Sequence, residues 1–378
     1  MTKQIYRNIF KEIGKSDEEI KARLDEAIRI FFFDEEERIY HDGPDNTGYL
    51  VDTGNIDART EGMSYGMMMC VQLDMKEQFD RIWKWAKTYM YMSEGENEGY
   101  FAWSCGLDGT KNAFGPAPDG EEFFAMALFF AAHRWGNGEG IFDYESEAKA
   151  ILRACVHKGE NGREGFPMWN RDNAQILFVP GSPFTDPSYH LPHFYDLFAL
   201  WADEEDRAFW KRAADVSREY LAVACDANTG LCSEYAEFDG SPMKKELPWG
   251  YFGSFFSDAY RTAANIGLDT EWFGIDKGQN GAPLRMMKFF KTSLEACRCS
   301  YEVDGTPIDR PVLHPLGLLA TMAQSALTIP KDSSDFEIAR RWVEWFWEQP
   351  MRQGVRRYYD NCLYMFAMLS LSGNYRIW

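Results

Sequence analysis

Glu61 is the one carboxylate in a run of small, apolar and aromatic residues that extends from Thr60 to Cys70. Burial among such residues raises the pKa of a carboxyl group, because a low dielectric disfavours the charged form. A carboxyl group that is still protonated near neutral pH is what a general acid requires. The run also predicts a helix beginning near Thr60, where the helix dipole favours the anion and where a glutamate also has a structural use. The two effects on the pKa of Glu61 oppose each other, and the sequence leaves their balance open.

Two aspartates stand at the starts of two other apolar helical segments. Asp119 follows Pro116 and Pro118 and precedes a long apolar run, so it also suits the N-cap position of a helix. Asp258 has Arg261 three residues on, one turn away on the same helix face. A guanidinium group and a helix N-terminus both lower the pKa of a carboxyl group, so we expect Asp258 to be ionised, as a general base must be. The same pair is equally compatible with a structural contact between the two side chains.

These segments, in this order along the chain, resemble glycoside hydrolase family 8, most closely its members that release xylose from the reducing end of xylo-oligosaccharides. The motifs extend from about residue 50 to the C-terminus, so the resemblance covers nearly the whole chain, and residues 1–40 contribute little to it. The motifs that carry it are Arg59–Met67, Phe101–Cys105, Pro118–Glu121, Asp186–Pro192, Phe256–Arg261, Leu313–Pro315 and Arg357–Asn361.

The resemblance implies a role for four residues at the point of cleavage. Glu61 matches the general acid of the family and Asp258 its general base. Asp119 matches the acidic residue that holds the sugar at the cleavage point and helps to distort it. Tyr189 matches the tyrosine that helps to position the attacking water.

The resemblance also implies contacts with the rest of the substrate. Trp103 resembles a stacking platform beside the acid, and Arg261 and Tyr359 are further predicted substrate-binding residues. His314 falls where the exo-acting members have a loop that closes the leaving-group side of the cleft. An imidazole group there is able to hydrogen-bond the free anomeric hydroxyl group, which exists only at a reducing end. An isolated loop histidine also fits a structural role in a turn that enters a helix.

The reaction that this resemblance implies is inverting hydrolysis of short β-1,4-xylo-oligosaccharides, with no metal or cofactor. Inversion leaves room for a water molecule between the two carboxyl groups, so we expect them to be roughly 6.5–9.5 Å apart. Three alternatives are an endo-acting glycanase of the same family, a non-catalytic sugar-binding toroid, and a sugar epimerase or isomerase on a similar toroid. A binding protein has no need of an acid facing a base, and the six histidines supply no obvious pair for an epimerase.

Composition narrows the classes of partner. A formal net charge of −19 disfavours nucleic acid and anionic membranes, which bind basic patches, whereas a neutral oligosaccharide is compatible with it. The charge by itself also fits simple solubility. The longest apolar run, Phe123–Ala132, is too short to cross a bilayer, and the first residues lack an apolar core of signal-peptide length. Eight scattered cysteines, several in apolar helical stretches, suit reduced thiols. We therefore expect a cytoplasmic protein with no obligate protein partner.

Helical periodicity recurs along the whole chain, and no linker divides its 378 residues, so we expect residues 1–378 to form one domain. Ser16 is predicted to cap the first helix, and Gly136 and Gly267 to close two others. Short strands are predicted at Tyr49–Val51, Gln175–Val179 and Tyr301–Val303. About twelve helices are predicted, near 17–33, 61–74, 76–92, 120–135, 144–157, 189–202, 204–224, 256–266, 283–298, 313–327, 335–348 and 357–371.

This pattern indicates an all-α fold, either an α/α toroid of six inner and six outer helices or an irregular helical enzyme. The family resemblance implies the toroid, an (α/α)6 barrel. The long connections at 93–119, 158–188, 225–255 and 299–312 then gather at one end and form the walls of a cleft. Most of the aromatic residues, 16% of the chain, are expected in the core. A groove for a short glycan is expected to use Trp103, Trp169, Trp249 and Tyr359.

Overall fold

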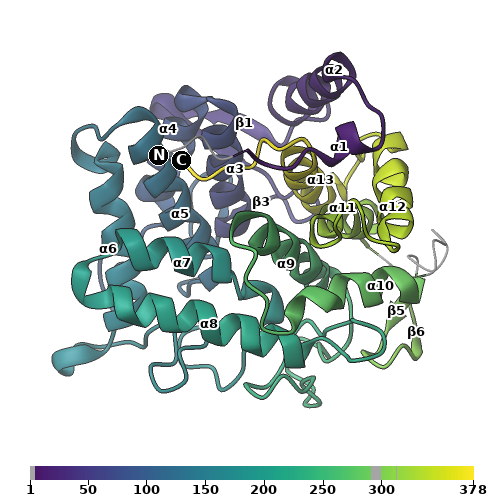
Figure 1. The fold of residues 1–378 in the computed structure, drawn as a ribbon. Helices are drawn as coiled ribbons and strands as arrows, with labels where there is room; N and C mark the ends of the chain where they lie inside the picture. The colour runs from purple at the N-terminus through teal and green to yellow at the C-terminus, as the bar shows by residue number, and fades with distance from the viewer. Residues whose placement is uncertain (1–4, 291–298, 312) are drawn as a thin grey trace.

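The computed structural model describes residues 5–290, 299–311 and 313–378, which fold into a barrel of helices (Figure 1). The end of the predicted helix 283–298, and Cys297 with it, lies outside the described residues. The α-helices are, in chain order, α1 (Ile9–Glu12), α2 (Asp17–Ile28), α3 (Thr60–Leu73), α4 (Lys76–Trp85), α5 (Pro118–Trp135), α6 (Tyr144–His157), α7 (Pro192–Trp201), α8 (Arg207–Ala224), α9 (Tyr260–Trp272), α10 (Ala282–Phe290), α11 (Pro315–Gln324), α12 (Phe336–Glu348) and α13 (Arg357–Leu371).

The helices α3, α5, α7, α9, α11 and α13 form the inner ring of the barrel. They are buried on nearly all sides: in α5 every residue from Pro118 to Ala131 is buried, and in α13 every residue from Tyr358 to Leu371. A helix that is apolar all round has to be covered by other elements. Successive inner helices contact one another, and the contact between α13 and α3 closes the ring.

The helices α2, α4, α6, α8, α10 and α12 form the outer ring, and each covers the inner ring with one face. In α12 the buried residues are Ala339, Trp342, Val343 and Phe346, a spacing that places them on one side of a helix. The regular alternation of inner and outer helices is the (α/α)6 barrel, so the predicted all-α fold is confirmed. None of the helices in the described parts of the chain combines the length and the apolar character that a membrane span requires.

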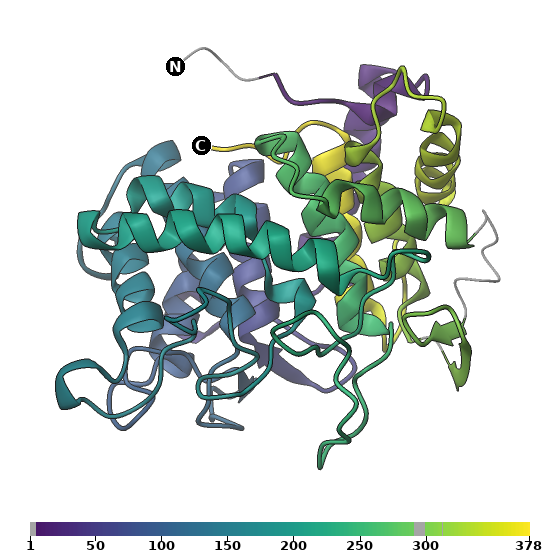
Figure 2. The same ribbon diagram turned by 60° about the horizontal axis from the view of Figure 1, so that its bottom comes forward.

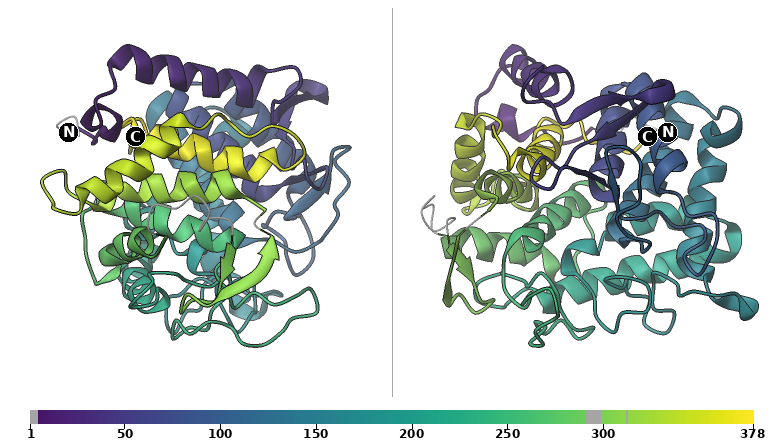
Figure 3. Two further views of the ribbon diagram at one scale, coloured as in Figure 1. Left: turned by 90° about the vertical axis from the view of Figure 1, so that its right-hand side faces the viewer. Right: turned by 180° about the vertical axis from the view of Figure 1, so that it is seen from behind.

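In the described part of the chain, three short pairs of antiparallel strands lie in the connections between helices (Figure 3). They are β1 (Tyr40–Gly43) with β2 (Thr47–Leu50), β3 (Asp57–Arg59) with β4 (Ser104–Gly106), and β5 (Cys299–Tyr301) with β6 (Pro307–Pro311). The predicted strands at Tyr49–Val51 and Tyr301–Val303 overlap β2 and β5. The strand predicted at Gln175–Val179 is wrong, because within that range Ile176 alone forms a β-bridge, with Trp169. The long connections gather at one end of the barrel (Figure 2).

Two of the three predicted helix signals are confirmed. Ser16 caps α2, with its hydroxyl oxygen accepting the N–H of Glu19 while the Glu19 carboxylate accepts the N–H of Ser16. Gly136 ends α5 with a φ of 81°, a conformation that favours glycine. Gly267 does not end a helix, because it lies inside α9. A Cβ atom there would lie 2.9 Å from the carbonyl oxygen of Gln324, so Gly267 allows α9 to approach the end of α11 closely.

Replacing Gly267 by alanine is expected to destabilise the protein. The added methyl group meets the backbone of Gln324 and Ser325, which cannot yield without moving α11 away from α9, so we expect a loss of about 1–3 kcal/mol in the free energy of unfolding. Chemical denaturation followed by circular dichroism measures it. Gly115→Ala is the control, since no atom lies within 4 Å of its Cβ position. An equal effect of the two substitutions would contradict the close helix contact.

Candidate active site

A cleft with a volume of about 660 Å³ opens at the end of the barrel where the long connections gather. Its lining contains all eight residues that the sequence predicts as site residues, although they are spread over 299 positions between the first and the last of the set. They are Glu61, Trp103, Asp119, Tyr189, Asp258, Arg261, His314 and Tyr359. The fold therefore brings the whole predicted set to one place.

Each inner helix contributes a polar residue at its N-terminal end. These residues are Glu61 in α3, Asp119 in α5, Tyr189 in the turn before α7, Asp258 in the turn before α9, His314 before α11 and Tyr359 in α13. The N-termini of all six inner helices thus meet at the cleft. The positive ends of the helix dipoles favour negative charge there, which suits a site rich in carboxyl groups.

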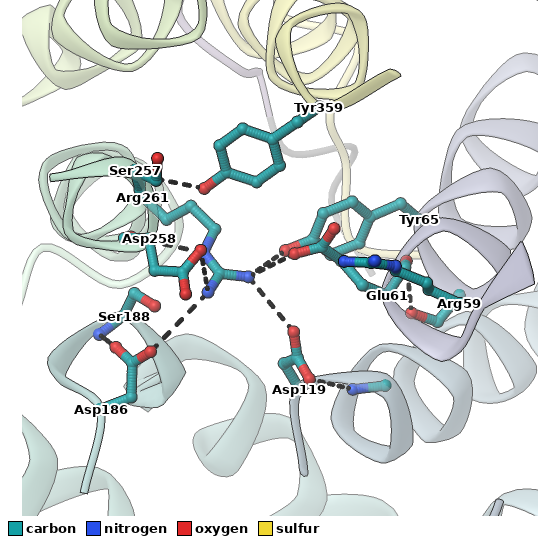
Figure 4. Close-up of polar contacts among 12 residues, drawn as sticks. Arg59, Glu61, Tyr65, Asp119, Asp186, Ser188, Ser257, Asp258, Arg261 and Tyr359 are labelled. Carbon is teal, nitrogen blue, oxygen red and sulfur yellow. Dashed lines mark hydrogen bonds and ion pairs between the residues drawn. The ribbon is translucent and has the colours of Figure 1, made fainter. Parts of the chain in front are cut away.

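The side chain of Arg261 lies at the centre of these groups (Figure 4). Its Nη1 donates hydrogen bonds to Glu61 Oε2 at 2.9 Å and to Asp119 Oδ2 at 3.2 Å. Its Nη2 lies 3.6 Å from Asp258 Oδ1 and 3.8 Å from Asp186 Oδ2. Glu61 and Asp258 approach the guanidinium group from opposite sides (Figure 4). One positive charge therefore faces four carboxyl groups.

The carboxyl group of Glu61 has the properties of an acid that works near neutral pH. Burial raises the pKa of Glu61 to about 7, although the attraction of Arg261 opposes this rise. The neighbouring carboxyl groups of Asp119 and Asp258 add to it. The hydroxyl group of Tyr358 donates a hydrogen bond to Glu61 Oε1 at 2.9 Å, which favours the anion and lowers the pKa. Burial thus prevails over the effects that favour the charged form.

Two further carboxyl groups share this environment. Burial raises the pKa of Asp119, against the attraction of Arg261. The interpretation of Asp119 as an N-cap is wrong, since Ala117 holds that position and Asp119 accepts the N–H of Gly120. Burial raises the pKa of Asp186 to about 8, again against Arg261. Asp186 belongs to the family motif Asp186–Pro192, and the sequence alone indicates no role for it.

Asp258 differs from the other three carboxyl groups in its exposure to solvent. Its side chain is 35% exposed, compared with 18% for Glu61, 9% for Asp119 and 0% for Asp186. Water in the cleft therefore has direct access to Asp258. The hydroxyl group of Tyr359 donates a hydrogen bond to the carbonyl oxygen of Ser257, the residue before Asp258, at 3.1 Å.

Aromatic side chains form part of the walls of the cleft. Trp103 is 37% exposed, and the guanidinium group of Arg59 lies 5.2 Å from its ring centroid. Arg59 is close to Glu61 in sequence, but its guanidinium group pairs with Asp57 at 3.0 Å. The cation beside Glu61 is therefore Arg261. Trp249 is 59% exposed and also lines the cleft. The expectation for Trp169 is wrong, because this side chain is fully buried in the core.

Metal ligation has no support in this geometry. Among the described residues, no group of three or more His, Cys, Asp or Glu side chains is arranged to hold a metal ion. The carboxyl groups of the cleft instead surround a guanidinium group, which takes the place that a cation would occupy. The arrangement is therefore suited to proton transfer between side chains, water and a bound neutral molecule.

Residues 45–372 match the glycosyl hydrolases family 8. The chain belongs to this family. It is 56% identical to the reducing end xylose-releasing exo-oligoxylanase of Halalkalibacterium halodurans, over 99% of this chain and 94% of that protein. The structure of Rex8A from Paenibacillus barcinonensis complexed with xylose is similar with a TM-score of 0.94 at 53% identity, over 99% of this chain and 97% of that one. Endoglucanase 2 of Ruminiclostridium josui is a more distant relative, 27% identical over 85% of this chain and 65% of that protein.

Membership of glycosyl hydrolase family 8 makes this protein a glycosidase. Glycosidases cleave the bond between sugars with a pair of carboxyl groups, one acting as an acid. The pair that the cleft offers is Glu61 with its raised pKa and the more exposed Asp258. Tyr358 lies in one of the family motifs, and its sequence position indicates no role for it, but its hydroxyl group contacts Glu61 directly.

Substituting Tyr358 by phenylalanine tests the link between Glu61 and activity. The activity of a general acid is lost once its proton is lost, so we expect kcat/KM of the wild-type glycosidase to fall as the pH rises through about 7. Tyr358→Phe removes a hydrogen bond that favours the carboxylate, which raises the pKa of Glu61 and moves this fall to higher pH. Profiles of kcat/KM against pH measure the shift.

Tyr364→Phe is the matched control for this experiment. Tyr364 also lies in α13, but its hydroxyl group donates to the carbonyl oxygen of Gln349, away from the cleft. The control is expected to leave the fall in activity at its wild-type pH. A Tyr358→Phe profile that coincides with the wild-type profile would remove Glu61 as the group that titrates.

Proposed function

We propose that this glycosidase is an inverting exo-oligoxylanase, which hydrolyses short β-1,4-xylo-oligosaccharides and releases xylose from their reducing end. One observation carries the proposal: in a single cleft, a carboxyl group with a pKa raised to about 7 faces a more exposed carboxyl group across one guanidinium group. The relatives that are more than half identical to this chain support the choice of substrate and of the cut end, since they are reducing-end xylose-releasing exo-oligoxylanases.

In the proposed reaction, Glu61 donates its proton to the glycosidic oxygen as the bond to the leaving xylose breaks. The carboxylate that this leaves is stabilised by Arg261 Nη1 and by the Tyr358 hydroxyl group, each at 2.9 Å. Asp258 removes a proton from a water molecule that attacks the anomeric carbon from the opposite face. The predicted separation of the two carboxyl groups, roughly 6.5–9.5 Å, belongs to this proposal.

The remaining site residues have proposed roles in holding the sugar. Asp119 contacts the hydroxyl groups of the distorted ring, and burial raises its pKa against the attraction of Arg261. Tyr189 positions the attacking water, and Trp103 offers an exposed ring face for stacking. Tyr359 and Arg261 belong to the same wall, and His314 bounds the leaving-group side of the cleft.

The main alternative is an endo-acting glycanase of the same family. It has support from endoglucanase relatives, but at 27% identity, compared with 56% for the exo-acting relative. A non-catalytic sugar-binding protein has less support, because such a protein gains nothing from a buried acid near neutral pKa beside an accessible base.

Three broader proposals accompany this function. Residues 1–378 act as one catalytic domain, which is supported by a single main apolar core that joins residues from Ile9 to Tyr375. The partner is the oligosaccharide alone, with no nucleic acid, membrane or obligate protein partner. The protein works in the cytoplasm, which agrees with short substrates and with six described cysteines that are buried free thiols. Cell fractionation with an antibody against the protein tests the location.

Xylotriose labelled with 18O or a radioisotope in its reducing-end sugar tests the end that is cut. We expect the label to appear first in xylose, because His314 is proposed to bound the leaving-group side of the cleft. Thin-layer or mass analysis of early products measures this. Proton NMR of the same digest is expected to show the new reducing end of xylobiose as the α-anomer. Label that appears first in xylobiose would favour an endo-acting enzyme, and an initial β-anomer would indicate retention.

Two substitutions separate the roles of acid and base. Glu61→Gln keeps the shape of the side chain but removes the proton, so we expect turnover of xylotriose to fall by at least ~10²-fold. The same variant should lose much less activity on β-xylobiosyl fluoride, because fluoride leaves without protonation. Asp258→Asn should lose activity on both substrates, because each needs an activated water. Steady-state kinetics on the two substrates measure this, and equal losses in Glu61→Gln would exclude it as the acid.

A further inference from the structure

Glu122 is a buried residue of α5, and it follows Asp119 by three positions, so the two side chains lie on the same side of the helix. Asp119 lines the cleft. The carboxyl group of Glu122 is instead hydrogen-bonded, through Oε1, to the hydroxyl group of Tyr195 in α7. The helix that carries one predicted site residue therefore also contacts the next inner helix of the barrel.

The Tyr195 hydroxyl group has two hydrogen-bonding partners and one proton. Its oxygen lies 3.0 Å from the carbonyl oxygen of Tyr189, and its other partner is Glu122 Oε1. A carbonyl oxygen can only accept, so the contact with Tyr189 uses the proton of the hydroxyl group. The contact with Glu122 then needs a proton from the carboxyl group, which the hydroxyl oxygen is able to accept. Both contacts together require Glu122 to be a neutral carboxylic acid.

The surroundings of Glu122 favour the neutral form. Its Oε2 is buried and, among the described residues, has no hydrogen-bonding partner. An unpartnered oxygen in a buried site is far more costly in an ionised carboxylate than in a neutral acid. Burial raises the pKa of Glu122 well above its ordinary value, although the hydrogen bond with Tyr195 opposes the rise. The neighbouring carboxyl group of Asp119 adds to this rise.

We propose that Glu122 is a positioning residue, a neutral acid that donates a hydrogen bond to Tyr195 and so directs the Tyr195 hydroxyl group to the carbonyl oxygen of Tyr189. This contact fixes Tyr189 at the place where it is proposed to hold the attacking water. The inference rests on the proposed function and deepens it, because it adds the residues that support the water-positioning tyrosine. An ionised Glu122 would instead accept the proton of Tyr195 and leave the Tyr189 carbonyl oxygen without it.

Tyr189 is then held on both sides along the chain. On its N-terminal side, the N–H of Ser188 donates to Asp186 Oδ1 at 2.7 Å. Asn265 Nδ2, from α9, donates to the carbonyl oxygen of Ser188 at 2.8 Å. On the other side, the Tyr195 hydroxyl group donates to the carbonyl oxygen of Tyr189 itself. These contacts fix the backbone of a residue that lies in a short turn before α7.

The ring of Tyr195 is itself firmly placed. It is fully buried, makes an edge-to-face contact with Trp169 at a centroid distance of 5.6 Å, and packs against Trp210 at 5.8 Å. Close packing of this kind leaves the hydroxyl group little freedom except rotation of its proton, and a donor on Glu122 removes that freedom. The core of the barrel thus presents a fixed donor to the Tyr189 carbonyl oxygen.

Replacing Tyr195 by phenylalanine tests the contact with Tyr189. We expect kcat on xylotriose to fall roughly tenfold, the effect of one hydrogen bond, with KM changed by less than about twofold, because the water and not the sugar loses its support. β-Xylobiosyl fluoride should show the same fall, since it also needs the attacking water. Tyr364→Phe is the matched control: Tyr364 is also a buried tyrosine of an inner helix, and its hydroxyl group donates to the carbonyl oxygen of Gln349 at 3.2 Å. It is expected to keep the wild-type kcat.

A double variant separates positioning from general stability. Tyr189→Phe removes the hydroxyl group that is proposed to hold the water, so it should lower kcat by itself. Adding Tyr195→Phe should then cause no further fall in kcat, because the two residues act through one water molecule. Falls in kcat that multiply would show that Tyr195 is structural and would overturn the inference.

Two substitutions of Glu122 test its part as a donor. Glu122→Leu keeps a similar volume but leaves the Tyr195 oxygen without a donor and its proton free to rotate, so we expect a several-fold fall in kcat. Glu122→Gln places a neutral group with N–H donors at the same position and should recover most of this loss. A Glu122→Gln variant as impaired as Glu122→Leu would contradict the proposed donor.

Infrared spectroscopy gives a readout that does not depend on activity. A neutral carboxylic acid has a C=O stretching band at a higher frequency than the bands of a carboxylate. At neutral pH, the difference spectrum between the wild-type protein and Glu122→Gln is expected to show the loss of one carboxylic acid band. Loss of carboxylate bands in its place would show an ionised Glu122 and overturn the inference.

The outcomes distinguish this inference from the proposed function. If Tyr195→Phe keeps the wild-type kcat, the inference is overturned, while labelled xylotriose that loses its reducing-end xylose first still supports the proposed function. If Tyr189→Phe alone leaves kcat unchanged, the proposed role of Tyr189 fails and the inference fails with it. If xylotriose is cut at the other bond, the exo assignment fails, and the effect of Tyr195→Phe on β-xylobiosyl fluoride still tests the inference.

Discussion

The contact of one guanidinium group with four carboxyl groups is the constraint on which the site depends. Arg261 neutralises one negative charge, so ionisation of all four carboxyl groups would leave a large excess of negative charge in a partly buried cleft. Burial is the main cause of the raised pKa values of Glu61, Asp119 and Asp186; the neighbouring carboxyl groups add to the rise, and Arg261 opposes it. The near-neutral pKa of Glu61 thus arises from burial first and from the crowding of carboxyl groups around a single cation second.

The barrel creates this crowding, because its inner helices run in one direction. Six N-termini converge on the cleft, and their dipoles partly offset the repulsion between carboxyl groups. The pairing of β3 with β4 adds a second fixed element: the N–H of Thr60, at the start of α3, donates to the carbonyl oxygen of Trp103 at 3.0 Å. The acid and the neighbouring aromatic wall are therefore positioned by one short piece of sheet. Without this strand pair, only a loop would position the wall that carries Trp103 relative to the start of α3.

The sequence predicted the helices well because each inner helix is apolar all round and each outer helix has one apolar face. It predicted the members of the cleft through family motifs, and all eight residues line one cavity. It failed where a residue's role depends on its neighbours in space. Gly267 was expected to end a helix, yet it permits a contact with Gln324, 57 positions further along the chain. Trp169 was expected in the groove, but its ring packs against Tyr195 and Trp210 in the core.

A comparison of the pKa of Glu61 with those of two other buried glutamates shows the effect of Arg261 on the acid. Glu121 lies two residues after Asp119 and is fully buried. Its carboxyl group accepts a hydrogen bond from the N–H of Phe101 and not from a guanidinium group, and burial raises its pKa to about 8. Burial raises the pKa of Glu122, bonded to Tyr195, well above the ordinary value. Glu61 is held lower, at about 7, by Arg261 and Tyr358. For Glu61, Arg261 and the Tyr358 hydroxyl group both oppose the effect of burial on the pKa. A carboxyl group whose pKa lies near neutral pH is suited to donate a proton and to recover it.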